Sequence, residues 1–194
     1  MKQNKLKLFF FIAIIGITGT SNSVYSQEGS LSPAYNLLKA VKDGDYSKVR
    51  THLQRGTNVN TRDYNDGETP LYIATQNRDA TMVTFLLQGK AKPDIGTKTT
   101  GETPLMLAVR LKLMKITEML ISQRADINIG DRNGETALYK AVRANDRDSV
   151  KALLGANADW SLADNTGRTP LDLARENRRL RSMVKLLEDA GAEY

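Results

Sequence analysis

The single histidine is the residue whose type comes nearest to catalytic chemistry in this sequence. To act as a base, His52 would need a nucleophile and an orienting carboxylate within reach, and the sequence suggests neither. We therefore interpret His52 as a partly covered residue of a terminal helix. The chain contains no cysteine, which removes most of the usual metal-ligand sets. The sequence predicts no enzyme activity, no cofactor and no metal site.

Two acidic segments superficially match calcium loops, Asp63 to Glu68 and Asp131 to Glu135. A calcium loop of the EF-hand type places glycine sixth and a bidentate glutamate six residues later. Here the glycine comes too early and the late glutamate is missing, so we interpret both segments as turns stabilised by aspartate side chains. The segment from Asp164 to Gly167, which could be mistaken for part of an aspartic protease, is the same kind of turn.

One eight-residue pattern occurs four times, with glycine first, threonine third, leucine fifth and alanine eighth. Its glycines are Gly67, Gly101, Gly134 and Gly167, which stand 33 or 34 residues apart. The glycine suits a tight turn with positive φ, the threonine caps a helix, and proline, fourth in three copies, is tolerated in the first helical turn. A second apolar stripe at helical spacing follows in each copy. Each repeat therefore predicts two helices and an extended finger.

These features resemble the ankyrin repeat, through the Gly-x-Thr-Pro-Leu-x-x-Ala start, the Val-x-x-Leu-Leu helix and the Ala-Asp-x-Asn exit. A further copy upstream lacks the Thr-Pro-Leu start but keeps the rest, with Ser32 and Pro33 as its helix start. The resemblance implies an all-α repeat solenoid of helix-turn-helix units with hairpin-like fingers. About five repeats are expected, including the caps, at approximately 32–65, 66–99, 100–132, 133–165 and 166–194.

The sequence departs from the family pattern at two positions. The histidine that usually follows Thr-Pro-Leu, and usually ties neighbouring repeats by hydrogen bonds, is replaced by Tyr72, Met106, Tyr139 and Asp172. We therefore expect the stack to rely more on apolar packing. The glycine that usually ends the second helix is replaced by Lys90, Arg124 and Asn157, and we expect backbone strain at the first two.

The N-terminus is typical of an export signal. Lys2, Lys5 and Lys7 precede an apolar run from Leu8 to Ile17, which is too short to span a bilayer. We predict a signal peptide at residues 1–26 and an ankyrin-repeat domain at 27–194, exported by a bacterial cell to the periplasm or secreted. The three lysines account for half of the net charge of +6. The remaining +3 argues against a nucleic-acid partner.

The resemblance implies a concave groove lined by the finger tips and the exposed side of the first helices. Leu111 stands at a usually polar position, and we expect it to be exposed there. Arginine and tyrosine often dominate interface energy. The predicted groove residues are Arg62, Tyr64, Asn65, Gln76, Lys98, Arg110, Leu111, Arg132 and Arg143.

Two functions remain open at this point. The first is a monomeric, non-enzymatic adaptor or scaffold that binds another protein in the groove outside the cytoplasm. The alternative is binding of an anionic envelope component, such as a membrane surface, through the C-terminal arginines. Those arginines are Arg175, Arg178, Arg179 and Arg181. Trp160 is interpreted as a packing residue between two repeats.

Overall fold

The structure is a computed structural model that describes residues 32–192, and these residues form five pairs of helices. The pairs are α1 (Pro33–Lys42) with α2 (Tyr46–Gln54), α3 (Pro70–Gln76) with α4 (Ala80–Gln88), α5 (Pro104–Arg110) with α6 (Met114–Ser122), α7 (Ala137–Arg143) with α8 (Arg147–Gly155), and α9 (Pro170–Glu176) with α10 (Arg181–Asp189), the last pair joined by the short 3₁₀ helix η1 (Arg178–Leu180). The predicted signal peptide lies outside the described residues.

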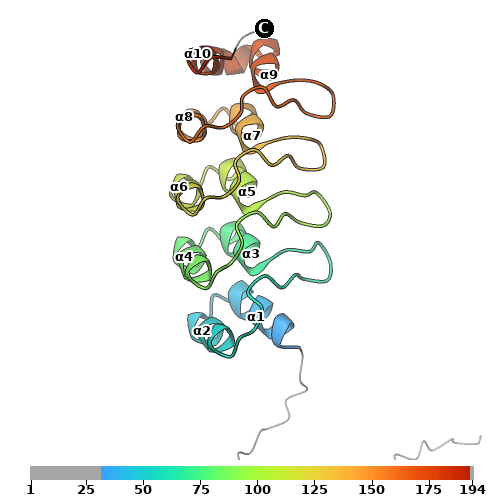
Figure 1. Cartoon of the computed structure of the whole chain (residues 1–194), viewed down its shortest axis with the longest axis vertical. Coiled ribbons are helices and arrows are strands. Elements are labelled where there is room, and N and C mark those ends of the chain that lie inside the picture. The colour runs from blue at the N-terminus through green and yellow to red at the C-terminus, as the bar shows by residue number, and fades with distance from the viewer. Residues whose placement is uncertain (1–31, 193–194) are drawn as a thin grey trace, which may run out of the picture. The chain divides into compact units, whose positions relative to one another are not determined.

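The helix pairs stack in one column, with the odd-numbered helices next to a row of extended fingers (Figure 1). Neighbouring odd-numbered helices contact one another along the column, and each also packs on the even-numbered helix that follows it. No strand is present among residues 32–192. The predicted all-α repeat solenoid is therefore confirmed. Over the same residues, no helix has the length and apolarity that crossing a membrane requires.

Side-chain caps define where most of the helices begin. In α3, α5, α7 and α9 the hydroxyl of a threonine accepts a hydrogen bond from the amide three residues later, as predicted. Ser32 does the same for α1. Asp45, Asp79 and Asp146 cap α2, α4 and α8. These caps satisfy amides that a helix start otherwise leaves without a partner.

Left-handed backbone ends both helices of the inner repeats. Lys90, Arg124 and Asn157 have φ of 65°, 60° and 63° after the second helices, so the predicted left-handed conformation is confirmed. The turns between the paired helices also use positive φ, at positions that the sequence analysis did not identify. These are Gly44, Arg78, Lys112 and Asn145.

The core runs through the whole stack, because each helix pair completes the apolar surface of its neighbours. Leu71, Leu105, Leu138 and Leu171, which share one register position, are at most 3% exposed. Trp160 is half-buried and packs against this core, as predicted. His52 is also half-buried, with its Nδ1 3.5 Å from the Thr57 hydroxyl. Leu111, expected to be exposed, is half-buried because it forms the C-cap of α5.

Helix α6 of the third repeat has two locally unfavourable features, one in its capping and one in its buried hydrogen bonding. Leu113 stands at the N-cap of α6, where its side chain makes no capping hydrogen bond. Thr117, in the same helix, is fully buried and its hydroxyl has no hydrogen-bond partner. A missing cap and an unpaired buried hydroxyl each cost about 1 kcal/mol. Both features therefore lower the local stability of the third repeat.

Replacing Arg124 by glycine is expected to stabilise the chain by about 1 kcal/mol, because only glycine adopts a φ of 60° without steric cost. The side chain of Arg124 is exposed, so little contact is lost. Thermal unfolding should show a midpoint about 2–4 °C higher. The neighbouring Gln123→Gly is the control, because Gln123 has φ −86° and gains nothing from glycine. Equal midpoints for the two variants would contradict the inferred strain.

Candidate functional site

Four fingers connect the helix pairs, and each is closed by a backbone hydrogen bond. The amides of Asp63, Thr97, Asp131 and Asp164 donate to the carbonyl oxygens of Glu68, Glu102, Glu135 and Arg168, at 2.9–3.1 Å. In three fingers the aspartate side chain also accepts amides of the same loop. The aspartates thus act in turns, as predicted. Among residues 32–192, no three His, Cys, Asp or Glu side chains gather as a metal site.

Equivalent residues at the finger tips form a continuous row. We call Tyr64, Lys98, Arg132 and Asn165 the finger-tip row. The amide of Lys98 donates to Asp66 O at 2.7 Å, Arg132 N to Thr100 O at 2.8 Å, and Asn165 N to Asn133 O at 2.8 Å. The Arg132 guanidinium also donates to Lys98 O, and the Asn165 side chain to Arg132 O. These bonds tie each finger to the one before it and fix the order of the row.

The finger glycines make this close stacking possible. At Gly67 a Cβ would overlap the side-chain stem of Lys98, and at Gly134 it would overlap Asn165. Both glycines also have positive φ, 69° and 76°. Glycine is therefore required twice over, by the turn and by the approach of the next finger. The stem of Lys98 therefore lies against the preceding finger.

The ends of the first helices form a second row, in which the predicted groove arginines are already paired. Arg110 donates from Nε and Nη2 to the two carboxylate oxygens of Glu102, at 2.8 and 3.0 Å. One repeat later, Arg143 donates from Nη1 to Glu135 Oε1. In the last repeat the charges are exchanged, with Arg168 3.6 Å from Glu176.

Tyrosine hydroxyls join these pairs across repeat boundaries. The Tyr72 hydroxyl donates to Glu102 Oε2 at 2.7 Å, and the Tyr139 hydroxyl donates to Asp164 Oδ2 at 2.8 Å. The expectation that replacement of the family histidine leaves mainly apolar packing is therefore wrong at these two junctions. Tyrosine carries a donor at the end of its ring, which reaches the acid of the next repeat.

Met106 supplies no donor at the remaining inner junction, and a buried lysine replaces it. Lys140 is 5% exposed, and its Nζ lies 2.7 Å from Asp131 Oδ2 and 2.9 Å from Glu135 Oε2. Glu135 thus has a cationic partner from its own repeat instead of a hydroxyl from the preceding one. Buried charges are tolerated where they are paired and hydrogen-bonded.

The pKa values in this network reflect burial and the donors around each carboxylate. Burial raises the pKa of Glu102, but hydrogen bonds from Arg110 and Tyr72 lower it by more and hold it below its ordinary value. Hydrogen bonds from Thr166 and Tyr139 likewise lower the pKa of Asp164, against the effect of burial. Burial and the bond to Asp164 raise the pKa of Tyr139 to about 12. The acids are therefore ionised and the tyrosines are protonated at neutral pH.

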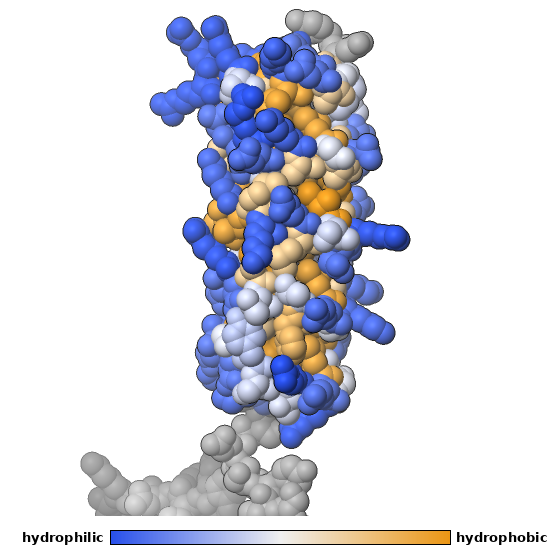
Figure 2. All heavy atoms as spheres, turned by 90° about the vertical axis from the view of Figure 1, so that its left-hand side faces the viewer, coloured by the Kyte–Doolittle hydropathy of each residue, from blue (hydrophilic) through white to orange (hydrophobic). Residues whose placement is uncertain are grey.

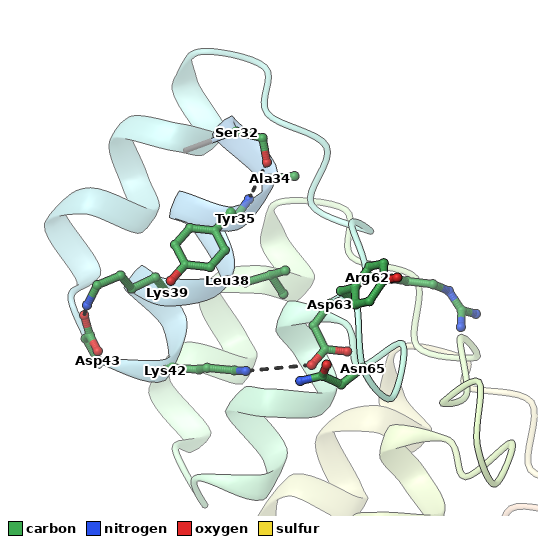
Figure 3. Close-up of a pocket in the computed structure, with 11 residues that line it drawn as sticks. Ser32, Ala34, Tyr35, Leu38, Lys39, Lys42, Asp43, Arg62, Asp63 and Asn65 are labelled. Carbon is green, nitrogen blue, oxygen red and sulfur yellow. Dashed lines mark hydrogen bonds and ion pairs between the residues drawn. The ribbon is translucent and has the colours of Figure 1, made fainter. Parts of the chain in front are cut away.

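A hollow of about 460 Å³ opens between α1 and the first finger. Figure 3 shows Tyr35 and Leu38 of α1 on one side and Arg62, Asp63 and Asn65 of the finger on the other. Tyr64 also lines the hollow, and its side chain is 97% exposed. We call this feature the α1 hollow. It lies at the start of the finger-tip row.

The structure separates the predicted groove residues into four groups. Tyr64, Lys98 and Arg132 lie together on the finger-tip row, and Arg62 and Asn65 border the α1 hollow. Arg110 and Arg143 are held by buried acids, and Gln76 hydrogen-bonds Glu68 in the equivalent place. Half-buried Leu111 belongs to the α5–α6 turn.

Sequence reasoning missed the wall of the hollow formed by Tyr35 and Leu38. The available signal was Tyr35, an aromatic residue one turn before Lys39 on the polar side of α1. The glutamates after the finger glycines were also missed as partners of Arg110 and Arg143. Their signal was the recurrence of opposite charges eight residues apart, at 102 and 110 and at 135 and 143.

The even-numbered helices present a different surface. Figure 2 shows apolar residues reaching that surface between polar ones along the stack. The guanidinium of Arg50 lies 5.8 Å from the centre of the Phe85 ring, and the Tyr46 hydroxyl bonds Asp79 at 2.7–2.8 Å. Tyr46 and Phe85, the two aromatic residues described on this surface, therefore already have partners within the chain.

The C-terminal arginines are not a single cluster. Arg175 donates to Glu188 at 2.8 Å, at the outer side of the last pair. Arg178, Arg179 and Arg181 are exposed, and their side chains make no hydrogen bond or ion pair with other described residues. Three of the four predicted arginines thus remain available at this end of the stack.

Comparison with known proteins links the repeats to one family. The family described as "Ankyrin repeats (3 copies)" matches residues 37–131 and 113–194. The chain is 33% identical over 93 residues, 48% of its length, to "BRCA1-associated RING domain protein 1" of Caenorhabditis elegans, and 39% identical over 72 residues, 37% of its length, to "2-5A-dependent ribonuclease" of Homo sapiens. These alignments cover 13% and 10% of the two relatives. The activities in the two relatives' names therefore belong to those proteins and are not transferred to this chain.

Removing the Tyr72 hydroxyl with Tyr72→Phe is expected to cost about 1.5–3 kcal/mol at pH 7, because the bond is made to a buried carboxylate. Denaturant unfolding measures this loss. Tyr64→Phe is the matched control, because Tyr64 is 97% exposed. Equal stability of the two variants would refute a role for the hydroxyl between repeats.

The stability difference between the natural chain and Tyr72→Phe is also expected to depend on pH. The pKa of Glu102 is lower in the folded state than in the unfolded state. The contribution of the ionised carboxylate to folding stability is therefore fully present above the unfolded pKa of about 4.3 and is lost as the pH falls through the folded pKa. The difference between the natural chain and Tyr72→Phe should therefore shrink below about pH 4. A difference that stays constant down to pH 3 would point to a contact other than this one.

Proposed function

This chain belongs to the ankyrin-repeat family, and on that premise we propose that it is a non-enzymatic adaptor that binds another protein along its fingers. Ankyrin repeats are generally protein–protein interaction modules, and the family is typically non-catalytic. The observation that carries the proposal is the finger-tip row, where Tyr64 stands exposed and Lys98 and Arg132 follow in register.

The helix-end arginines are excluded from the proposed contact. A glutamate at position 110 or 143 would face Glu102 or Glu135 at close range and destabilise the fold. Loss of binding in such variants would not distinguish a contact from unfolding. Tyr64 and Lys98 are better test positions, because both side chains are exposed and neither forms a hydrogen bond or ion pair with other described residues.

We expect the immobilised chain to retain a specific protein from envelope extract, and Tyr64→Ala/Lys98→Gln to lose it. The double control Lys151→Gln/Lys185→Gln changes exposed lysines on α8 and α10 and should retain it. Circular dichroism establishes that all forms are folded. Retention of the same proteins by both double variants would place the contact elsewhere and overturn the finger assignment.

The alternative of an anionic envelope component is kept because Arg178, Arg179 and Arg181 are exposed and have no internal partner among the described residues. Vesicles containing phosphatidylglycerol serve as its probe in the same experiment. Binding that disappears at 300 mM salt and in Arg178→Gln/Arg179→Gln/Arg181→Gln would favour this alternative, because exposed charge attraction is screened over about 8 Å at physiological salt.

Export forms the remaining part of the proposal. The pattern of residues 1–26 supports action outside the cytoplasm, in the periplasm or after secretion. Mass spectrometry of the protein recovered from its natural cells should find a chain that begins at Gln27. An intact N-terminus in the cytoplasmic fraction would refute export.

A further inference from the structure

The α1 hollow has the chemistry of an apolar pocket. Its inner surface includes Leu38 and the ring of Tyr35, which is 48% exposed, and Tyr64 stands at its rim. Four of the five charged groups of the lining are paired with one another, and the fifth is Arg62. Lys39 lies 2.6 Å from Asp43, and Lys42 lies 3.8 Å from Asp63. An uncharged aromatic or branched side chain therefore fits this hollow better than a charged one.

The finger tips beyond the hollow expose positive charge. Arg62 points away from α1 (Figure 3), and its one hydrogen bond is a long contact of 3.4 Å to Gly67 O. Lys98 and Arg132 make no ion pair among the described residues. Glu102 and Glu135, the glutamates of the two fingers that carry Lys98 and Arg132, are buried and paired with donors.

One exposed carboxylate limits where a negative partner group fits. Asp66 is exposed on the first finger, next to the hollow. A partner's acids are therefore disfavoured at this finger and favoured at the next two, where Lys98 and Arg132 follow. The apolar hollow and the two cations thus occupy successive positions along one edge of the stack.

The spacing along this edge suits an extended chain. Neighbouring packed helices stand about 10 Å apart, so equivalent finger tips recur at about that interval. An extended peptide advances about 3.3 Å per residue. One repeat of the solenoid therefore corresponds to about three residues of a bound peptide.

We propose that the α1 hollow and the finger-tip row bind an extended acidic segment of a partner protein. An aromatic or branched apolar residue of that segment fills the hollow between Tyr35 and Tyr64. Carboxylates about three and six residues further along the segment lie at Lys98 and Arg132. This inference rests on the proposed adaptor function and names the chemistry of its partner.

Short synthetic peptides test the proposal directly. The probe is a fluorescein-labelled peptide with the sequence Trp-Gly-Ser-Glu-Gly-Ser-Glu, used also in reversed order because the direction of the partner is open. Comparison peptides replace Trp by Ala, both Glu by Gln, or both Glu by Lys. Fluorescence anisotropy with the full chain, at 50 and 300 mM NaCl, gives the dissociation constants.

We expect one direction of the probe to bind at least tenfold more tightly than each comparison peptide. Tyr64→Ala should weaken binding at least tenfold at both salt concentrations, because an aromatic contact is lost. Lys98→Gln/Arg132→Gln should weaken it at 50 mM NaCl and remove most of the salt dependence. Lys151→Gln/Lys185→Gln, which carries the same change of charge on the opposite helices, should bind like the natural chain.

Four outcomes overturn the inference. Equal binding of the acidic, neutral and basic peptides removes the charge argument, and binding unaffected by Tyr64→Ala removes the hollow. A dimer in sedimentation that Tyr64→Ala dissociates would show that a second copy fills the hollow instead. If the capture experiment retains a partner but no acidic peptide binds, the adaptor function stands and this inference alone fails.

Discussion

The mutual coverage of neighbouring repeats is the constraint on which the other features depend. A helix pair has an apolar side that only the next pair can cover, and this stacking buries a continuous core. The same stacking covers the glutamates that follow Gly101 and Gly134, leaving Glu102 and Glu135 at most 8% exposed. A buried carboxylate must have donors. The polar network on the first helices is therefore a consequence of the solenoid itself.

This network decides which cations remain for a partner. Arg110 and Arg143 neutralise the buried glutamates, and they hold the ends of the first helices to the fingers. At the finger tips, Lys98 and Arg132 form no ion pair with other described residues, and the Arg132 guanidinium donates to Lys98 O. Arg110 and Arg143 therefore stabilise the fold, whereas Lys98 and Arg132 are the cations that we propose for contact with a partner.

The sequence predicts the repeats well because their signals are local. The glycine turns, the threonine caps and the left-handed residues at 90, 124 and 157 each depend on a few adjacent residues. The pairing of Tyr72 with Glu102 joins residues 30 positions apart, and it exists only when two repeats are stacked. The α1 hollow depends on how far the first finger stands from α1, a separation that no local pattern determines. The sequence therefore predicted residues of the candidate site but not how these residues are arranged in space.

The junction between repeats at Met106 shows that the pairing of the buried carboxylate is constrained, whereas the residue that supplies its partner can vary. Where the tyrosine donor is absent, Lys140 supplies the charge that Glu135 needs, so the requirement is a satisfied carboxylate and not a particular residue. Substitutions in this layer must preserve the pairing, which limits how far it can adapt to a partner. The finger-tip row has no such requirement, and its four equivalent positions hold Tyr64, Lys98, Arg132 and Asn165. The backbone bonds of Lys98, Arg132 and Asn165 repeat while their side chains differ, which is the combination that the proposed recognition of a partner requires.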